Sequence, residues 1–492
     1  MAGALELARN GLVLGIVYII GHVLYNLYLH PLRKYPGPLS HRMTVIPRTL
    51  ELLYGRLPFH VNKLHQQYGP VVRIAPNELA FSSPQAWRDI YGHKKIGEEE
   101  FPKYDGVYKI FGPNVANSLL NSEREEHGHL RRQMSHGFSD RSMREQEPII
   151  GSYVNLLVAQ LKAAVARGGT SQNMREWYNF TTFDIISDLS FGVSGGFGCL
   201  KNGEYHPWVR LVNATIRQGA VVQGMYRLGL QRPIAWVNQL SLLAENKHRA
   251  IVHEKVGERM QGGERPDFLE GLLRRKEELK LGHDHLTMNA SLLIIAGSET
   301  TATLLSGATF LLLTHPEKLR KLEQEVRSAF KSDEEITLTS VGSLSYMLAC
   351  LNESLRRYPP VTTGLPRQAP KGGAMVDGGF VAEGTIVSVF QYAVNHDERY
   401  WTDPYGFAPE RWMGDLKYKG DTLDAMQSFS VGPRNCIGRN LAYAEMRLIL
   451  ARLIYNFDMS LADESRDWLE GQKAFNVWDK PALYVHMKPV AA

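Results

Sequence analysis

The stretch Phe429-Ser-Val-Gly432-Pro-Arg434-Asn-Cys436-Ile-Gly438 places one cysteine between glycines, just before a helix predicted over Ile437–Ile454. A helix start presents free N–H groups and a partial positive charge, which stabilise a thiolate and lower the pKa of a cysteine. The glycines let the backbone approach a large flat ligand, and Arg434 is placed to pair with an anionic group on it. A buried, inert thiol is the commoner state of a lone cysteine, so the residues around Cys436 decide between the two interpretations.

These residues match the pattern Phe-x-x-Gly-x-Arg-x-Cys-x-Gly without departure. The segment resembles the heme-binding loop of the cytochrome P450 family, the heme-thiolate monooxygenases. The resemblance implies that Cys436 is the axial thiolate ligand of the iron in heme b (iron protoporphyrin IX), and that Phe429, Arg434 and Gly438 contact this cofactor. A thiolate ligand pushes electron density toward the iron and favours O–O cleavage.

A second motif, Glu353-Ser-Leu-Arg356, places a carboxylate and a guanidinium on one face of a predicted helix. Alone, such a pair is usually a surface salt bridge of little energetic value. Here Tyr358-Pro359-Pro360 ends the helix, and Arg411 follows later in Pro-Glu-Arg-Trp. This arrangement resembles the Glu-x-x-Arg pair of the same family and its third member. The resemblance implies that Glu353, Arg356 and Arg411 form a buried ion network with a structural role.

The apolar segment Leu286–Leu313 contains a polar notch, Ala296-Gly-Ser-Glu-Thr-Thr301. A second membrane span is one interpretation, but Glu299 would be costly at the centre of a bilayer. A long buried helix that ends at His315-Pro316 agrees better with the pattern. The notch resembles the oxygen-binding groove of the family, in which small residues make room for dioxygen. The resemblance implies that Thr300 hydrogen-bonds dioxygen and that Glu299 relays protons from solvent; alternatively, the Thr300 hydroxyl bonds only to its own helix.

Two arginines are candidates for binding the two heme propionates. The segment His127-Gly-His-Leu-Arg131 resembles the third helix of the family, which implies that Arg131 contacts one propionate beside His127. Arg367, which follows Gly364-Leu365-Pro366, resembles a strand arginine that contacts the other. Arginine suits this role because its planar guanidinium forms bidentate bonds with carboxylates. Solvation at the surface is the alternative for both arginines.

The amino-terminal segment Leu12–Leu29 is an uncharged, apolar run close to the roughly 20 residues that a membrane-spanning helix needs. A cleaved signal peptide would have a basic start, a shorter apolar run and a small-residue cleavage site. Only Arg9 precedes the run, whereas Arg33, Lys34, Arg42 and Arg48 follow it, which places the body of the protein in the cytosol. We expect residues 1–30 to anchor the protein in the endoplasmic reticulum membrane and residues 31–492 to form the monooxygenase domain.

The composition excludes several classes of protein. With 44% hydrophobic residues among 492 the chain is not intrinsically disordered, and three cysteines cannot form a disulfide framework. Because 56 Lys and Arg are nearly balanced by 51 Asp and Glu, no nucleic-acid partner is expected. Val71–Ala75 and Glu78–Ser82 predict two short strands around a turn. We expect a mainly α fold with small β-sheets, the cytochrome P450 fold, preceded by one N-terminal transmembrane helix.

The resemblance implies a reaction that inserts one oxygen atom of O2 into a lipophilic small-molecule substrate. Because no flavin or nicotinamide module is recognisable, electrons from NADPH must arrive through a separate flavoprotein reductase. The basic residues Arg132, Arg439 and Arg447 offer a docking face for it. The opening Leu29–Pro38 resembles that of fungal microsomal members, many of which oxidise terpenoids, alkaloids or polyketides of secondary metabolism.

Two other functions stay open at this point. One is a heme-thiolate enzyme of non-oxygenase type, such as an isomerase, a dehydratase or a ring-coupling enzyme; the other is a heme sensor without turnover. Isomerases and dehydratases of this kind often lack the acid–threonine pair, so Glu299-Thr300 argues against them. The sequence does not specify the substrate.

Overall fold

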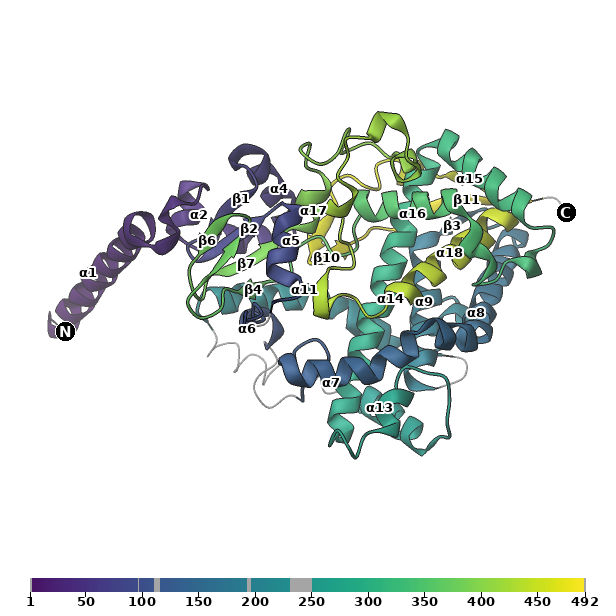
Figure 1. Ribbon diagram of the computed structural model, residues 1–492, viewed down its shortest axis with the longest axis horizontal. Helices are drawn as coiled ribbons and strands as arrows, with labels where there is room; N and C mark the ends of the chain where they lie inside the picture. The colour runs from purple at the N-terminus through teal and green to yellow at the C-terminus, as the bar shows by residue number, and fades with distance from the viewer. Residues whose placement is uncertain (1, 96, 110–115, 193–195, 231–249, 491–492) are drawn as a thin grey trace.

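The computed structural model describes residues 2–95, 97–109, 116–192, 196–230 and 250–490. Helix α1 (Ala2–Leu24) projects away from the body of the protein (Figure 1) and continues into a π-helical turn over Tyr25–Leu29. Among the described residues, two helices are long and apolar enough to cross a membrane, Ala4–Leu29 and Asp140–Ala166. The second helix contributes to the hydrophobic core, whereas the apolar side chains of the first are exposed.

Four short strands form a sheet at the end of the body from which α1 projects (Figure 1). Strands β1 (Val71–Ala75) and β2 (Glu78–Phe81) pair antiparallel around Pro76-Asn77, which confirms the predicted hairpin. Strand β2 pairs in parallel with β7 (Ile386–Val389), which pairs antiparallel with β4 (Arg367–Gln368). The sheet therefore positions Arg367, one of the predicted site residues, through contacts between segments far apart in sequence.

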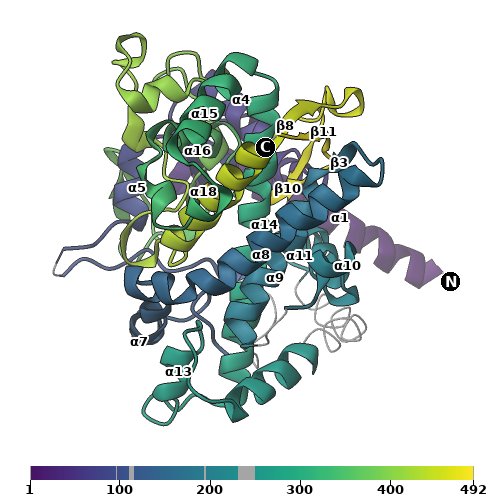
Figure 2. The ribbon, with the colours of Figure 1, turned by 90° about the vertical axis from the view of Figure 1, so that its right-hand side faces the viewer.

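Helix α14 (His283–Leu313) runs through the middle of the helical part of the protein (Figures 1 and 2). It packs against α9 (Met174–Phe191), α16 (Ser345–Arg357) and α18 (Arg439–Asn456). Every residue from 301 to 312 is buried by protein, so the alternative of a second membrane span is wrong for this segment. Its apolar residues are covered by neighbouring helices instead of lipid.

Helix α18 begins two residues later than the predicted start, at Arg439, and ends at Asn456. Residues 432–434 form a turn of 3-10 helix, and Asn435 is extended. The backbone before Gly438 therefore forms the loop around Cys436 and does not extend the helix. A cysteine in this position lies just outside the helix, on the side of its free N–H groups.

The hydrophobic core has one main cluster, which joins residues between Leu119 and Met487, and two smaller clusters at the sheet end of the protein. Further helices are α2 (Leu39–Met43), α3 (Ile46–Leu53), α4 (Leu57–Tyr68), α5 (Pro84–Tyr91), α6 (Asp105–Tyr108), α7 (Arg124–Met134), α8 (Asp140–Ala166), α10 (Cys199–Asn202), α11 (Pro207–Arg227), α13 (Glu270–Arg274), α15 (Pro316–Ala329) and α17 (Gln391–Asn395). The remaining strands are β3 (Ser171–Asn173), β5 (Ala374–Val376), β6 (Gly379–Val381), β8 (Phe457–Leu461), β9 (Lys473–Phe475), β10 (Val477–Asp479) and β11 (Tyr484–Pro489).

Candidate heme site and proton-transfer residues

The loop that carries Cys436 is fixed by its backbone. The Cys436 N–H donates to the Phe429 carbonyl at 2.8 Å. Gly432 has a φ of 76°, and a Cβ there would clash with the Tyr91 carbonyl oxygen, so only glycine fits. At Gly438, by contrast, a Cβ would meet no protein atom closer than 3.8 Å. The protein itself therefore does not require glycine at 438, and the open space beside it can admit a ligand.

The Cys436 side chain is accessible, whereas Cys199 and Cys350 are buried. Desolvation by the surrounding protein nevertheless raises the pKa of Cys436 and outweighs the opposing effects of the Gly438 N–H, Arg131 and Arg439. The accessible surface of the Cys436 side chain is thus closely bordered by protein. The predicted lowering of the pKa by the helix start is thus wrong for the protein alone, because burial disfavours the thiolate. A coordinated metal ion would deprotonate the thiol outright.

The polar notch of α14 also has accessible side chains. Ile295 and Ala296 are exposed although α14 lies inside the protein, so accessible space adjoins the helix at this turn. Thr300 lies one turn after Ala296, and its hydroxyl donates to the Ala296 carbonyl at 2.7 Å. The alternative of bonding to its own helix is therefore realised, and the hydroxyl oxygen keeps the capacity to accept a further hydrogen bond.

The notch glycine lies at a close contact between two helices. A Cβ at Gly297 would lie 2.5 Å from Cδ1 of Ile186 on α9. The packing of α9 against α14 therefore favours a small residue at this position. Ala296, one residue earlier, is exposed.

Glu299 has a partner that the sequence did not indicate. The buried ammonium of Lys480, which directly follows β10, forms an ion pair with Glu299 Oε1. Lys480 also donates to the Thr303 hydroxyl at 2.6 Å. No sequence signal links Lys480 to the notch, because 181 residues separate it from Glu299.

Basic side chains surround His127 on α7. Burial, followed by the charges of Arg434, Lys103, Arg131 and Arg367, lowers the pKa of His127 to about 3. The structure therefore brings together four of the six predicted cofactor-binding residues, which come from three separate segments. Lys103, which sequence reasoning missed, adds a fifth basic group; burial, followed by the charges of Arg367 and Arg434, lowers its pKa to about 6.

The contacts of this cluster show how much of its charge is compensated. Arg434 Nε lies 3.5 Å from a carboxylate oxygen of Glu100, and Arg131 donates to the Asn435 carbonyl at 2.6 Å, which braces the cysteine loop. Arg367 donates to the Tyr108 hydroxyl at 3.1 Å, and the Lys103 ammonium donates to a backbone carbonyl. Positive charge predominates here, so the cluster fits a ligand with carboxylate groups, such as the two propionates of heme.

The predicted reductase face is only partly exposed. Arg132 and Arg439 are exposed, whereas Arg447 is half-buried against the Tyr443 ring, 5.7 Å from its centroid. The Phe429 ring also packs on Tyr443, with the ring centroids 5.3 Å apart. Phe429 therefore supports the start of α18 beside the cysteine loop.

The predicted ion network is buried at the end of α16. Arg356 donates to both carboxylate oxygens of Glu353, at 2.9 and 2.7 Å, and Arg411 Nε lies 3.0 Å from the same carboxylate. Asp421, which the sequence did not indicate, pairs with Arg411. These four side chains are completely buried and carry two positive and two negative charges. We call them the buried ion quartet.

Glu445 on α18 is a second buried carboxyl next to the notch. Burial raises its pKa to about 8, although a hydrogen bond with Thr301 opposes the shift. The pKa of Glu445 in the folded protein lies above the ordinary glutamate value of 4.5, so the folded protein keeps a proton that the unfolded chain releases between these pH values. Stability should therefore fall as the pH rises through this window.

We expect Glu445→Gln to remove that pH dependence. Glutamine does not titrate, whereas wild type should lose about 1.4 kcal/mol of stability per pH unit above the unfolded pKa until the folded pKa is reached. Thermal unfolding of the holoprotein at about pH 5 and pH 8 measures the difference, with the exposed Glu464→Gln as control. If the thermal midpoint depended on pH equally in wild type and Glu445→Gln, the expectation would be wrong.

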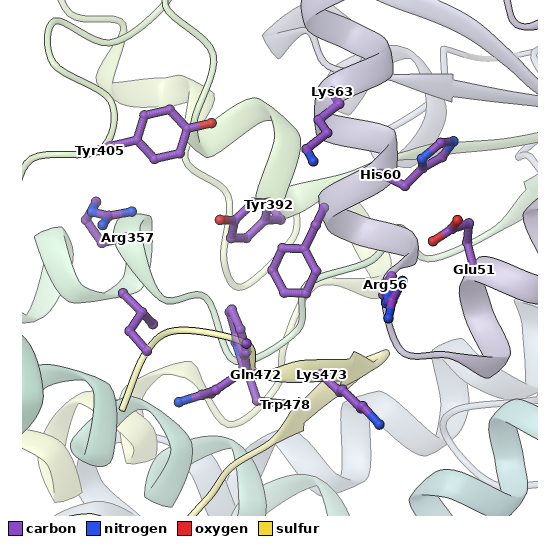
Figure 3. Close-up of a pocket in the computed structure, with 13 residues that line it drawn as sticks. Glu51, Arg56, His60, Lys63, Arg357, Tyr392, Tyr405, Gln472, Lys473 and Trp478 are labelled. Atoms are coloured by element: carbon purple, nitrogen blue, oxygen red, sulfur yellow. The ribbon is translucent and has the colours of Figure 1, made fainter. Parts of the chain in front are cut away.

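A separate hollow of about 630 Å³ lies between α4, α17 and strands β9 and β10 (Figure 3). Its lining includes Arg56, Lys63, Arg357, Tyr392 and Trp478. None of the predicted site residues lines it. Although it is large, this hollow is therefore distinct from the site around Cys436 and α14.

Comparison with known proteins agrees with this geometry. Residues 38–485 match the model of the family Cytochrome P450, and the chain belongs to that family. It is 49% identical to the cytochrome P450 monooxygenase tpeC of Talaromyces stipitatus, over 97% of this chain and 95% of that protein. It is 44% identical to the trichothecene C-15 hydroxylase of Fusarium sporotrichioides, over 96% of each chain. The protein is thus a heme-thiolate monooxygenase of the fungal type, with the mainly α fold and small sheets expected.

Proposed function

We propose that Cys436 ligates the iron of heme b in this chain, and that the cation cluster around His127 binds the heme propionates. The observation that carries the proposal is the accessible thiol of Cys436 on the loop just before α18, whereas Cys199 and Cys350 are buried. Arg131, Arg367 and Arg434 are the propionate-binding residues predicted from sequence, and Lys103 joins them. Phe429 and Gly438 complete the contacts of the cysteine loop with the cofactor.

The heme, when bound, supplies the activation of dioxygen. The chain's own residues supply the protons and exclude water. The Thr300 hydroxyl borders the accessible space on α14 and holds a proton there, while Glu299 brings protons from the solvent side. Buried apolar residues of α14 after Thr300 keep this part of the protein dry, which strengthens each polar interaction at the site.

The substrate is a lipophilic small molecule of fungal secondary metabolism, of the terpenoid, alkaloid or polyketide class. Two observations support this class: similarity to a trichothecene hydroxylase along nearly the whole chain, and apolar residues Ile295 and Ala296 at the accessible turn of α14. Electrons come from NADPH through a flavoprotein reductase that docks on the basic residues Arg132, Arg439 and Arg447. Residues 1–30 anchor the enzyme in the endoplasmic reticulum membrane, and residues 31–492 form the catalytic domain in the cytosol.

Reconstitution tests the proposal. The full chain in phospholipid vesicles, with an NADPH-dependent flavoprotein reductase, should consume NADPH and O2 when a substrate from a terpenoid, alkaloid and polyketide panel is present. The product should contain one oxygen atom from isotopically heavy dioxygen. NADPH consumption with a product that lacks the label would favour ring coupling or another non-oxygenase reaction, and heme binding without any turnover would favour a sensor.

A further inference from the structure

The Lys480–Glu299 pair connects the end of strand β10 to the notch of α14. The Lys480 side chain is 1% exposed and that of Glu299 16%. Lys480 donates to both Glu299 and Thr303, and the Thr303 hydroxyl lies 3.4 Å from the same Glu299 oxygen. A buried ammonium is costly unless it is paired, so this arrangement holds the carboxylate and the ammonium in fixed positions.

The helix geometry separates this contact from the cofactor side of α14. Glu299 and Thr303 are one turn apart and share one face of the helix, whereas Ala296 and Thr300 share another. Ala296 borders the accessible space, but Glu299 is directed to Lys480. The acid and the threonine are therefore neighbours in sequence that face different surroundings, and Lys480 determines where the acid lies.

A small polar pocket joins Glu299 to the surface. Its volume is about 50 Å³, which is room for roughly three water molecules. Glu299 and Lys480 lie at its buried end. Arg217 and Asp479 also line it, and they form an ion pair with side chains 66% and 31% exposed. Exposure thus rises along the lining from Lys480 to Arg217.

Trp478 separates this pocket from the larger hollow in Figure 3, because it lines both. The Trp478 indole donates to the Pro359 carbonyl at 2.8 Å, and its ring stacks on Tyr358 with centroids 4.2 Å apart. These two contacts fix the Trp478 side chain between the two spaces. Solvent reaches Glu299 through the small pocket beside Arg217.

We propose that Lys480 is the positioning residue of the proton supply: it holds the Glu299 carboxylate in place at the inner end of the polar pocket, where the carboxylate takes up protons from solvent. Transfer to Thr300 then requires the carboxylate to leave Lys480 and turn toward the other face of α14. The proposal deepens the monooxygenase function above and rests on it. Lys480 does not itself touch the cofactor or the substrate.

Several charged or titratable groups face the pair. Arg175 and Asn179 on α9 and Arg217 on α11 line the pocket, together with Asp479. The charge of Glu299 also acts on Tyr205 and Tyr358. Lys480 is distinguished from the other cations by direct contact with the carboxylate, so its removal should have the largest effect on the titration of Glu299.

Lys480→Met in the full-length holoenzyme tests the proposal. Loss of a contacting cation should move the infrared titration of the Glu299 carboxyl to higher pH. The carboxyl stretch in infrared difference spectra, assigned with Glu299→Gln, follows this titration without turnover. The pH profile of oxygenated product formed per NADPH should move in the same direction, with product yield at neutral pH reduced about tenfold.

Three variants make the outcome specific. Lys480→Arg keeps the charge and should retain the wild-type infrared titration. Lys473→Met removes an exposed lysine of the neighbouring strand β9 and should leave the titration unchanged. If Lys480→Met does not fold, Lys480→Gln keeps a donor for Thr303 and gives the same measurement.

The two proposals fail in different ways. A wild-type protein without a thiolate-type CO spectrum or O2 consumption would overturn the monooxygenase site. A functional wild type whose Glu299 titration and pH profile stay the same in Lys480→Met and Lys480→Gln would overturn the role of Lys480 alone.

Discussion

Replacing Cys436 with alanine is expected to abolish the red-shifted Soret band that the ferrous CO complex of a heme-thiolate protein shows. The Cys436 thiol is the accessible one of the three cysteines, whereas Cys199 and Cys350 are buried. Without a thiolate, no described side chain of the loop can replace the lost electron donation, since alanine has no ligand atom. Product formation with reductase and NADPH should fall below detection, while heme content reports whether the cofactor is still held by the cation cluster.

Cys350→Ala is the matched control. Burial raises the pKa of the Cys350 thiol well above its ordinary value, so this cysteine stays protonated and inert. Its replacement should lower stability by about 1 kcal/mol through a small cavity and leave the Soret band in place. A band that persists in Cys436→Ala, or disappears in Cys350→Ala, would show that the ligand assignment is wrong.

The second large effect is expected at the buried ion quartet. Glu353→Gln leaves Arg356 and Arg411 with Asp421 as their only carboxylate in the quartet, so one buried positive charge is uncompensated. Breaking a buried pair in this way costs about 3–5 kcal/mol, a large part of a typical stability of about 5–15 kcal/mol. We expect a lower thermal midpoint, by about 4 °C or more for a chain of this size, and poor heme retention.

Arg88→Gln provides the comparison for that experiment. Arg88 pairs with Asp424 at 3.0 Å, but both side chains are 58% exposed. Such a pair contributes at most about 1 kcal/mol, so the thermal midpoint should hardly change. Equal midpoints for Glu353→Gln and wild type would mean that the quartet does not hold this part of the fold together.

Local spacing accounts for the features that were predicted correctly. Glu353 and Arg356 are three residues apart on one helix, so their contact follows from helix geometry. The hairpin of β1 and β2 follows from two apolar runs around Pro76-Asn77. In each case the residues that interact are close in sequence, and their geometry is set by a single element or turn.

The incorrect expectations concern forces that depend on the surroundings of a residue. The helix start does favour a thiolate at Cys436, but desolvation outweighs it, and the extent of burial cannot be calculated from a local pattern. In the same way, the local pattern does not show that Ile186 of another helix lies next to Gly297.

Residues that are near neighbours in the chain already indicate the family, the candidate ligand Cys436, the Glu353–Arg356 pair and the candidate membrane anchor, because each pattern is contained in one short segment. Three contacts became visible only in the folded protein: Asp421 pairs with Arg411, Lys103 lies among the basic residues near His127, and Lys480 pairs with Glu299. These contacts link separate elements, so the packing of the whole chain sets their distances. The partners of the polar side chains near the candidate site are therefore set by the folded protein and not by any single motif.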